Sequence, residues 1–187
     1  MKIIFVEKNS LFRLIPDSAL LLKNRPLFCP DHAQTLHAKI ALVVKINRLG
    51  KHIQEKFAPT YYNEIGVAIN FYNKNCLDTL TQEGLPWERA TCFDGSFALS
   101  EFMKIPENAN LSETSFSKNN NETQPFKIES TLQKIPHLIS ELSTFMTLKI
   151  GDYIAFELGE PTSAPLVIND VLRVYLGDEE MVRVVLK

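Results

Sequence analysis

At residues 36–46 the sequence reads Leu36-His37-Ala38-Lys39-Ile40-Ala41-Leu42-Val43-Val44-Lys45-Ile46. Every second residue from Leu36 to Ile46 is apolar, and this period of two predicts a long β-strand with one face in a core. The opposite face carries the basic side chains Lys39 and Lys45 and no carboxylate. This segment therefore indicates both the fold class and the chemistry that its second face can support.

Other segments with strand character surround this one on both sides. The predicted strands are Lys2–Val6, two short strands within Leu11–Leu22, Gly66–Phe71, a hairpin over Leu111–Ile128, Tyr153–Phe156, Val171–Leu176 and Met181–Leu186. Helices are predicted at Ile53–Ala58, Asn73–Glu83 and Pro136–Met146, the last with Pro136 in its first turn. No internal repeat or domain boundary is evident, so we expect a single β-rich α+β domain over residues 1–187.

Composition excludes several classes of protein. The 187 residues are 45% hydrophobic and 22% charged, which is close to the average for one globular domain. The net charge is −2 and the Lys and Arg residues are scattered, so no nucleic-acid partner is expected. No apolar run is long enough to cross a bilayer, and the N-terminus lacks the features of a signal peptide. Three widely spaced cysteines fit reduced thiols, so we expect a cytoplasmic protein without membrane attachment.

Four segments resemble the fumarylacetoacetate hydrolase family, particularly its small bacterial members. They are Gly50-Lys51-His52-Ile53, Tyr62-Asn63-Glu64-Ile65-Gly66, the pair Gly84-Leu85-Pro86-Trp87-Glu88-Arg89-Ala90 and Phe93-Asp94-Gly95-Ser96, and Phe145-Met146-Thr147-Leu148-Lys149-Ile150-Gly151-Asp152. Their order and spacing extend the resemblance over nearly the whole chain. The resemblance implies a mixed β-sandwich roll, a homodimer, and Mg²⁺- or Mn²⁺-dependent hydrolysis, decarboxylation or isomerisation of small keto acids.

The metal ligands of that family do not match this chain. The family places two glutamates two residues apart on one strand and an aspartate on the next, so that the carboxylates share one face. The resemblance places these positions at Lys39, Ala41 and Asn70. A cation and a methyl group cannot bind a divalent metal, and a neutral amide is a weaker ligand than a carboxylate. We therefore expect no metal cofactor at this site.

Other parts of the family site also differ. The family lysine that faces the substrate corresponds to Thr91, and a polar family position, often Gln, corresponds to Leu77. A Thr-Gly-Thr-Pro turn of the family is replaced by Glu157-Leu158-Gly159-Glu160-Pro161. A lid that carries a His and a Glu in active relatives is absent, because Val6 leads through a few residues to Pro16-Asp17-Ser18-Ala19-Leu20. The expected domain is thus one of the family type without the N-terminal lid.

These differences favour a catalytically inactive family member, with no catalytic residue, that binds a small anion or a protein partner. The hypothetical anion pocket consists of Lys39, Asn70, Lys74 and Thr91. We expect Lys39 to fill the former metal position and to hydrogen-bond Asn70, so that Lys39→Ala costs about 1–3 kcal/mol. The alternative is a hydrolase, isomerase or decarboxylase of a small keto acid, similar to 2-hydroxyhepta-2,4-diene-1,7-dioate isomerase. An enzyme with a new activity that needs no metal is also left open.

A different metal site would have to use other side chains. Cys29, His32 and His37 are the candidates, but no fourth ligand and no paired spacing accompany them. The sequence therefore does not support a site there.

Overall fold

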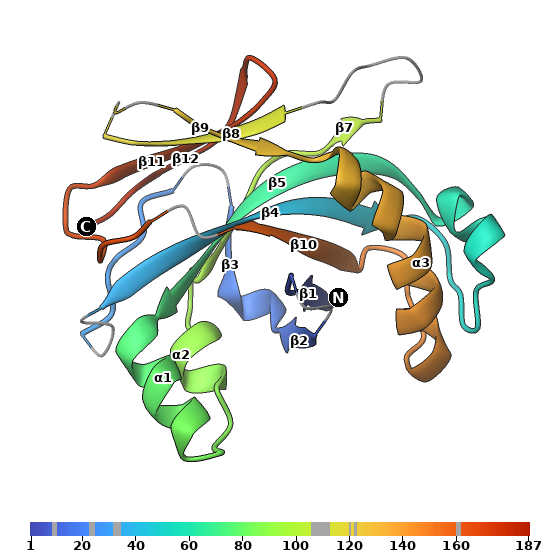
Figure 1. Cartoon of the computed structure of the whole chain (residues 1–187), viewed down its shortest axis with the longest axis horizontal. Coiled ribbons are helices and arrows are strands. Elements are labelled where there is room, and N and C mark those ends of the chain that lie inside the picture. Colours follow the sequence, from blue (N-terminus) through green and yellow to red (C-terminus); the bar gives the residue numbers. More distant parts are fainter. Residues whose placement is uncertain are drawn as a thin grey trace.

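The computed structural model describes residues 1–8, 11–22, 25–31, 35–105, 113–119, 121, 123–159 and 162–187, apart from the side chain of Leu22. It has an α+β fold in which a long, strongly curved sheet is covered on one side by a smaller sheet and flanked by helices (Figure 1). This is the β-rich α+β class that the sequence predicted.

The larger sheet contains eight strands within the described residues. They are β1 (Ile3–Val6), β2 (Phe12–Ile15), β3 (Leu20–Leu22), β4 (Leu36–Ile46), β5 (Tyr62–Asn73), β6 (Phe97–Leu99), β7 (Met103–Lys104) and β10 (Tyr153–Gly159). Their order is β2-β1-β10-β4-β5-β6-β3, and β7 pairs with β5 outside this order. The two longest strands, β4 and β5, are antiparallel neighbours at the centre.

This sheet curls so strongly that strands near its opposite edges face each other across the interior. Phe5 on β1 and Phe97 on β6 meet edge-to-face with ring centroids 6.5 Å apart. The strands β10, β4 and β5 lie between them in the sheet order, so a flat sheet would separate β1 from β6 by about 19 Å. The curl encloses an inner core formed by Ile3, Phe5, Ile15, Ala19, Ala41, Val43, Ala68, Phe97, Leu99 and Ala155.

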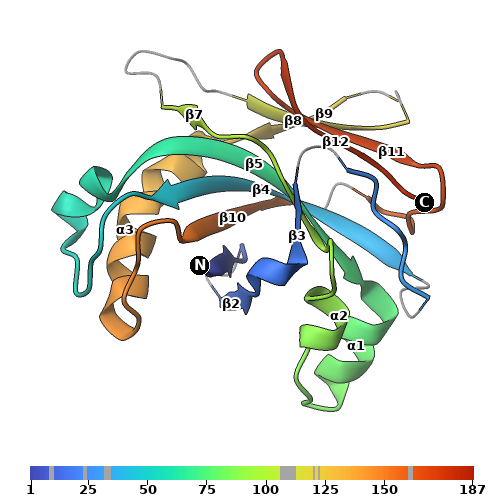
Figure 2. The ribbon, with the colours of Figure 1, turned by 180° about the vertical axis from the view of Figure 1, so that it is seen from behind.

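The smaller sheet covers the outer face of the curl. Its strands are β8 (Glu113–Lys118), β9 (Gln124–Lys127), β11 (Val171–Leu176) and β12 (Glu179–Val185), in the order β12-β11-β8-β9. Seen from behind, it lies across β5 and β4 (Figure 2). Side chains of β11 and β12 such as Val174 and Val184 pack there with Ile40 and Leu42 of β4 in an outer core.

The strand β4 has the bounds predicted for it, Leu36–Ile46, but its environment differs from the prediction in one respect. The expected apolar face lies in the outer core, and the second face is also buried because Ala41 and Val43 belong to the inner core. A strand covered on both sides has no solvent face. Lys39 is consequently held inside the protein, with 12% of its side chain exposed.

Two short helices lie at one end of the curl and a long helix at the other (Figure 1). The helix α1 (Lys74–Gln82) starts where predicted, because the Asn73 side chain accepts a hydrogen bond from the Cys76 N–H at 3.3 Å. It is followed by Gly84 with φ 65°, a conformation that glycine adopts without strain. The second short helix, α2, covers Glu88–Thr91.

The long helix α3 (Glu129–Phe145) begins earlier than predicted. Pro136 therefore lies in its interior, and the placement of this proline in the first turn was wrong. Proline removes one backbone hydrogen bond from a helix interior. Burial of Ile135, Ile139 and Leu142 in the outer core supplies the packing that holds the helix across this position.

The remaining predictions are met with shifted boundaries. Leu11–Leu22 forms β2, a 3₁₀ turn η1 (Asp17–Ala19) and β3, and the expected helix at Ile53–Ala58 is a 3₁₀ helix η2 (Glu55–Tyr61). The part of the chain that the structure describes contains no helix long and apolar enough to span a membrane.

Asp170 holds the start of β11 against β8. Its buried carboxylate forms an ion pair with Lys118 at 2.8 Å and accepts hydrogen bonds from Asn119 Nδ2 at 2.7 Å and from the Val167 N–H at 2.8 Å. Burial alone raises the pKa of Asp170, but these partners outweigh it and hold the pKa below its ordinary value. The carboxylate therefore stabilises the fold above about pH 4, and this contribution is lost as the pH falls through the lower, folded-state pKa.

We predict that Asp170→Asn lowers the free energy of unfolding by about 1–3 kcal/mol at pH 7, because charge-assisted hydrogen bonds are lost. The difference from the parent protein should shrink at acidic pH, where the parent carboxyl is itself protonated. Urea unfolding at pH 7 and at low pH measures both effects. Asp178→Asn, at the exposed turn between β11 and β12, is the control and should change little. A loss for Asp170→Asn that is equal at both pH values would contradict this account.

Candidate functional site

The interior of the curl ends in a polar cluster at one side of the inner core. We define this polar cluster as Glu7, Arg13, Lys39, Asn70 and Glu157. Each member lies two residues from an inner-core residue on or beside the same strand, so the two-residue period of a strand aims it into the same interior. The pairs are Phe5 and Glu7, Ile15 and Arg13, Ala41 and Lys39, Ala68 and Asn70, and Ala155 and Glu157.

Asn70 is fully buried and bonded at both ends of its amide. Its Oδ1 accepts a hydrogen bond from Arg13 Nη2 at 2.5 Å, and its Nδ2 donates to the Ser96 carbonyl at 3.1 Å. The Arg13 guanidinium also lies over the Phe5 ring, 4.5 Å from its centroid. Arg13 and Asn70 thus fix each other's positions at the end of the inner core.

Lys39 is paired with carboxylates. Its Nζ lies 3.3 Å from Glu157 Oε1 and 4.0 Å from Glu7 Oε1, and the same Glu7 oxygen lies 3.7 Å from Arg13 Nε. Lys39 and Asn70 are register partners on β4 and β5, but the expected hydrogen bond between their side chains does not form. The reason is that Arg13 bonds the Asn70 amide oxygen, while Glu157 and Glu7 attract the ammonium.

One donor of the cluster has no acceptor among the described residues. Arg13 Nε is buried and has no hydrogen-bond partner there, since the nearby Glu7 oxygen is too distant for one. Burial lowers the pKa of Arg13 from its ordinary value, and the surrounding carboxylates, Glu7 foremost, oppose this shift. A buried N–H of a cation that lacks an acceptor lowers the stability of the fold. Such a donor is well suited to hydrogen-bond an oxygen atom of an anionic ligand.

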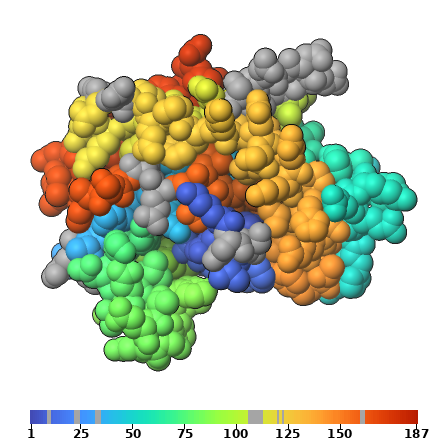
Figure 3. Space-filling view, viewed as in Figure 1, coloured from blue at the N-terminus to red at the C-terminus, as the bar shows by residue number. Residues whose placement is uncertain are grey.

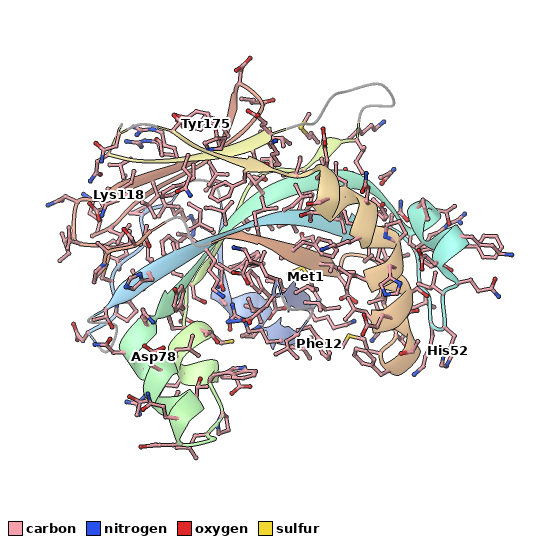
Figure 4. The ribbon with its side chains drawn as sticks, in the orientation of Figure 1. Met1, Phe12, His52, Asp78, Lys118 and Tyr175 are labelled. Carbon is pink, nitrogen blue, oxygen red and sulfur yellow. The ribbon has the colours of Figure 1, made fainter. Side chains whose placement is uncertain are left out.

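Arg13 faces a cavity of about 390 Å³, a size that accepts a small metabolite. Glu7, Arg13 and Lys39 line one side, and the other side is lined by Leu77, Asp78, Thr81, Gln82 and Trp87. Asp78, labelled in Figure 4, marks the α1 wall. Figure 3 shows the green surface of α1 and α2 beside the blue N-terminal strands. Residues of α1 and of the N-terminal segment line this cavity, together with Trp87 just before α2 and Lys39 of β4.

A larger cavity, of about 740 Å³, lies elsewhere, between β3 and residues 26–31 on one side and Phe93–Gly95 on the other. Its described lining residues include Asp31 and Asp94 but no Lys or Arg. It therefore offers no cation to an anionic ligand, and the smaller cavity at the polar cluster is the better candidate.

Of the four residues predicted to form an anion pocket, the structure places Lys39 and Asn70 together in the polar cluster. Lys74 is half exposed and forms an ion pair with Asp78 at 3.0 Å along α1. Thr91 is fully buried, and its hydroxyl donates to the Trp87 carbonyl at 3.2 Å. The sequence analysis did not identify Glu7, Arg13 and Glu157, although their two-residue offset from buried apolar residues was a usable signal.

The alternative metal site is not formed by the residues described. His32 lies outside them, and His37 is buried on β4 with its ring 5.8 Å from that of Tyr72. Cys29 pairs its backbone N–H with the Lys187 carbonyl. No group of three or more His, Cys, Asp or Glu side chains suited to a metal ion occurs in the described part of the chain.

Comparison with known proteins identifies the class of this fold and site. The family model for the fumarylacetoacetate (FAA) hydrolase C-terminal region matches residues 6–182, and the chain belongs to this family. It is 31% identical over 166 residues to the oxaloacetate tautomerase YcgM of Escherichia coli K12, covering 85% of this chain and 74% of that protein.

Two solved structures share the fold. A fumarylacetoacetate hydrolase family protein of Yersinia pestis CO92 has a TM-score of 0.87 and 25% identity, over 100% of this chain and 92% of that one. Fumarylpyruvate hydrolase of Pseudomonas aeruginosa, solved with Mn²⁺ and pyruvate, has a TM-score of 0.84 and 20% identity, over 100% and 90%. The E. coli relative is an oxaloacetate tautomerase, which supports the keto-acid alternative better than an inactive protein.

The residues of this chain do not fit the divalent metal that the family implies. Lys39 is cationic, Ala41 offers a methyl group, and the only side-chain oxygen of Asn70 already accepts a hydrogen bond from Arg13. The polar cluster instead contains two cations and two carboxylates.

We predict that Lys39→Ala lowers the free energy of unfolding by about 3 kcal/mol, because it leaves the Glu157 carboxylate, 5% exposed, without its cation. Adding Glu157→Gln should recover most of the loss, which a double-mutant cycle of chemical unfolding measures. Lys45→Ala on the same strand is the matched control. Its ion pair with Glu64 is more than one-third exposed on the lysine side, so we expect a loss below about 1 kcal/mol. Strictly additive effects of the changes at 39 and 157 would refute the pairing.

We also predict that calorimetric titration of the protein with Mg²⁺ or Mn²⁺ gives no saturable heat at micromolar concentrations. A triple variant with Lys39→Glu, Ala41→Glu and Asn70→Asp restores the three family carboxylates. In this variant Arg13 would still pair with the new aspartate and compete with the metal. The variant that also carries Arg13→Gln should bind metal, seen as a melting temperature or folding that depends on the metal. Tight binding to the parent protein that Asn70→Ala abolishes would disprove this prediction.

Proposed function

We propose that this protein binds a small keto acid in the cavity at the polar cluster and catalyses its keto–enol tautomerisation without a divalent metal. The observation that carries the proposal is the buried Arg13 Nε–H, which has no acceptor and belongs to a residue that lines the cavity. The oxaloacetate tautomerase of E. coli and the pyruvate-bound hydrolase of P. aeruginosa support the class of ligand.

The two cations of the cluster can bind the two oxygen-bearing groups of a keto acid. In the proposed complex the carboxylate of the keto acid accepts a hydrogen bond from Arg13 Nε, and the carbonyl oxygen of the keto acid faces the Lys39 ammonium. Fixed hydrogen-bond donors stabilise the negative charge that develops on an enolate oxygen. Two positive side chains thus take over the electrostatic part of catalysis that a metal ion performs elsewhere.

The carboxylates of the cluster provide the base. Tautomerisation moves one proton from the carbon beside the carbonyl to the carbonyl oxygen. The electron pair of the broken C–H bond forms the C=C bond, while the C=O bond becomes single. Glu7 lines the cavity and lies within 4.0 Å of both Arg13 and Lys39, so it can accept the proton from carbon. Lys39 can supply the proton to oxygen.

A second candidate function is ligand binding without turnover. It is favoured by the charge pairing, because both carboxylates already neutralise cations of the same cluster. In this case the protein would bind a keto acid through Arg13 but would not move a proton on it. Catalysis and binding must therefore be measured separately.

The test uses oxaloacetate, the substrate named for the E. coli relative, in the presence of EDTA. We expect the protein to accelerate the decay of the enol form, followed by its ultraviolet absorbance. Trp87, the single tryptophan, lines the cavity, so its fluorescence should report binding. Arg13→Lys keeps a positive charge but loses the Nε–H, and it should weaken binding about tenfold or more. Arg89→Lys on α2 is the matched control.

Each result has one consequence for this function. EDTA-resistant turnover that depends on Arg13 supports metal-free tautomerisation. A fluorescence change that depends on Arg13, without turnover, would favour the binding function. Turnover that EDTA removes, or binding that Arg13→Lys leaves intact, would overturn the proposal.

A further inference from the structure

Lys39 has the surroundings of a reactive amine. Its side chain lines the cavity yet is only 12% exposed, and its Nζ lies 5.8 Å from the centroid of the Tyr72 ring. Glu157 Oε1 is 3.3 Å from Nζ, a distance at which it can take a proton from the ammonium.

Building on the proposed function, we propose that Lys39 forms a Schiff base with the carbonyl carbon of the bound keto acid. Arg13 Nε would hold the carboxylate next to that carbonyl, which directs the carbonyl carbon toward the neighbouring amine. Lysine amines that are largely removed from water, or that lie next to another cationic group, are established nucleophiles toward carbonyl substrates. The position that would hold a metal ligand in the family would then hold a covalent catalyst.

The reaction balances with groups of the cluster and the substrate alone. Glu157 takes one proton from the Lys39 ammonium, and the free amine attacks the carbonyl carbon. A proton then moves from the attached nitrogen to the former carbonyl oxygen. Glu157 returns its proton to this hydroxyl, and loss of one water molecule gives the protonated imine. No oxidant or reductant is required, because an amine and a ketone give an imine and water.

The imine also provides a route to decarboxylation of β-keto acids that needs no metal. The bond to the β-carboxylate breaks, its electron pair moves toward the imine nitrogen to form an enamine, and carbon dioxide leaves. A proton from solvent water, passed on by Glu7, which lines the cavity, then adds to the carbon that lost the carboxylate. Water hydrolyses the resulting imine, which releases the shortened keto acid and restores the Lys39 amine.

The experiment traps the imine. The protein is incubated with pyruvate and EDTA, treated with sodium borohydride, and analysed by intact and peptide mass spectrometry. We expect one adduct that adds the mass of the keto acid less one oxygen atom. It should map to Lys39 with about tenfold or greater preference over any other lysine. Oxaloacetate decarboxylation should be lost in step with the trapping.

Two variants make the test specific. Lys39→Arg keeps the positive charge but removes the amine, and it should still quench Trp87 fluorescence with pyruvate while giving no adduct and no decarboxylation. Lys45→Arg, on the same strand, should keep both the adduct and the decarboxylation.

The outcomes separate this inference from the proposed function. Pyruvate binding to the parent protein without an adduct on Lys39 overturns the Schiff base and leaves keto-acid binding standing. If pyruvate neither binds nor forms an adduct, both the Schiff base and the proposed function are overturned. Adducts spread evenly over surface lysines, or retained in Lys39→Arg, also overturn the inference.

Discussion

Phe5 and Phe97 meet inside the larger sheet although three strands separate β1 from β6. Their contact requires the sheet to curl, and the curl turns one face of β1, β2, β4, β5 and β10 into a closed interior. Side chains on a strand alternate between faces, so a slip of one residue in β4 would remove Lys39 from this interior and replace it with a core residue. The register of Lys39 opposite Asn70 therefore positions the whole polar cluster.

The charges of this interior also follow from the curl. Ionised groups that are largely removed from water are stable only when they are paired or bound to a metal. Three carboxylates in one place would need a metal to offset their repulsion. Here Arg13 and Lys39 face Glu7 and Glu157, so the formal charge of the cluster is zero without any ion. The same pairing leaves one Arg13 donor available for a ligand.

Sequence patterns predicted the elements whose formation is local. The strand β4, the capped helix α1 and the hairpin of β11 and β12 each have periodicity or turn residues of their own. The start of α3 was missed because Pro136 suggested a helix start, whereas burial of Ile135 and Ile139 in the outer core extends the helix through it. The order of strands in the sheet and the second buried face of β4 depend on contacts between distant segments.

The candidate site could be predicted only in part for the same reason. Lys39 and Asn70 follow from the family resemblance and the spacing on two adjacent strands. Arg13 and Glu157 join them from β2 and β10, which lie far apart in the sequence. The two-residue offset of each from a buried residue indicates the side of the strand but not which other strands share it.

The hydrogen bond between Arg13 and Asn70 has a consequence for how such a site can change during evolution. Exchange of Asn70 for aspartate alone would give Arg13 an anionic partner in the same place. Exchange of Lys39 for glutamate alone would place a third carboxylate beside Glu7 and Glu157 and would remove the ammonium that pairs with them. A lineage moving between a metal-dependent and a metal-free interior therefore meets unequal barriers at these positions, and the order of the steps decides whether the intermediates fold.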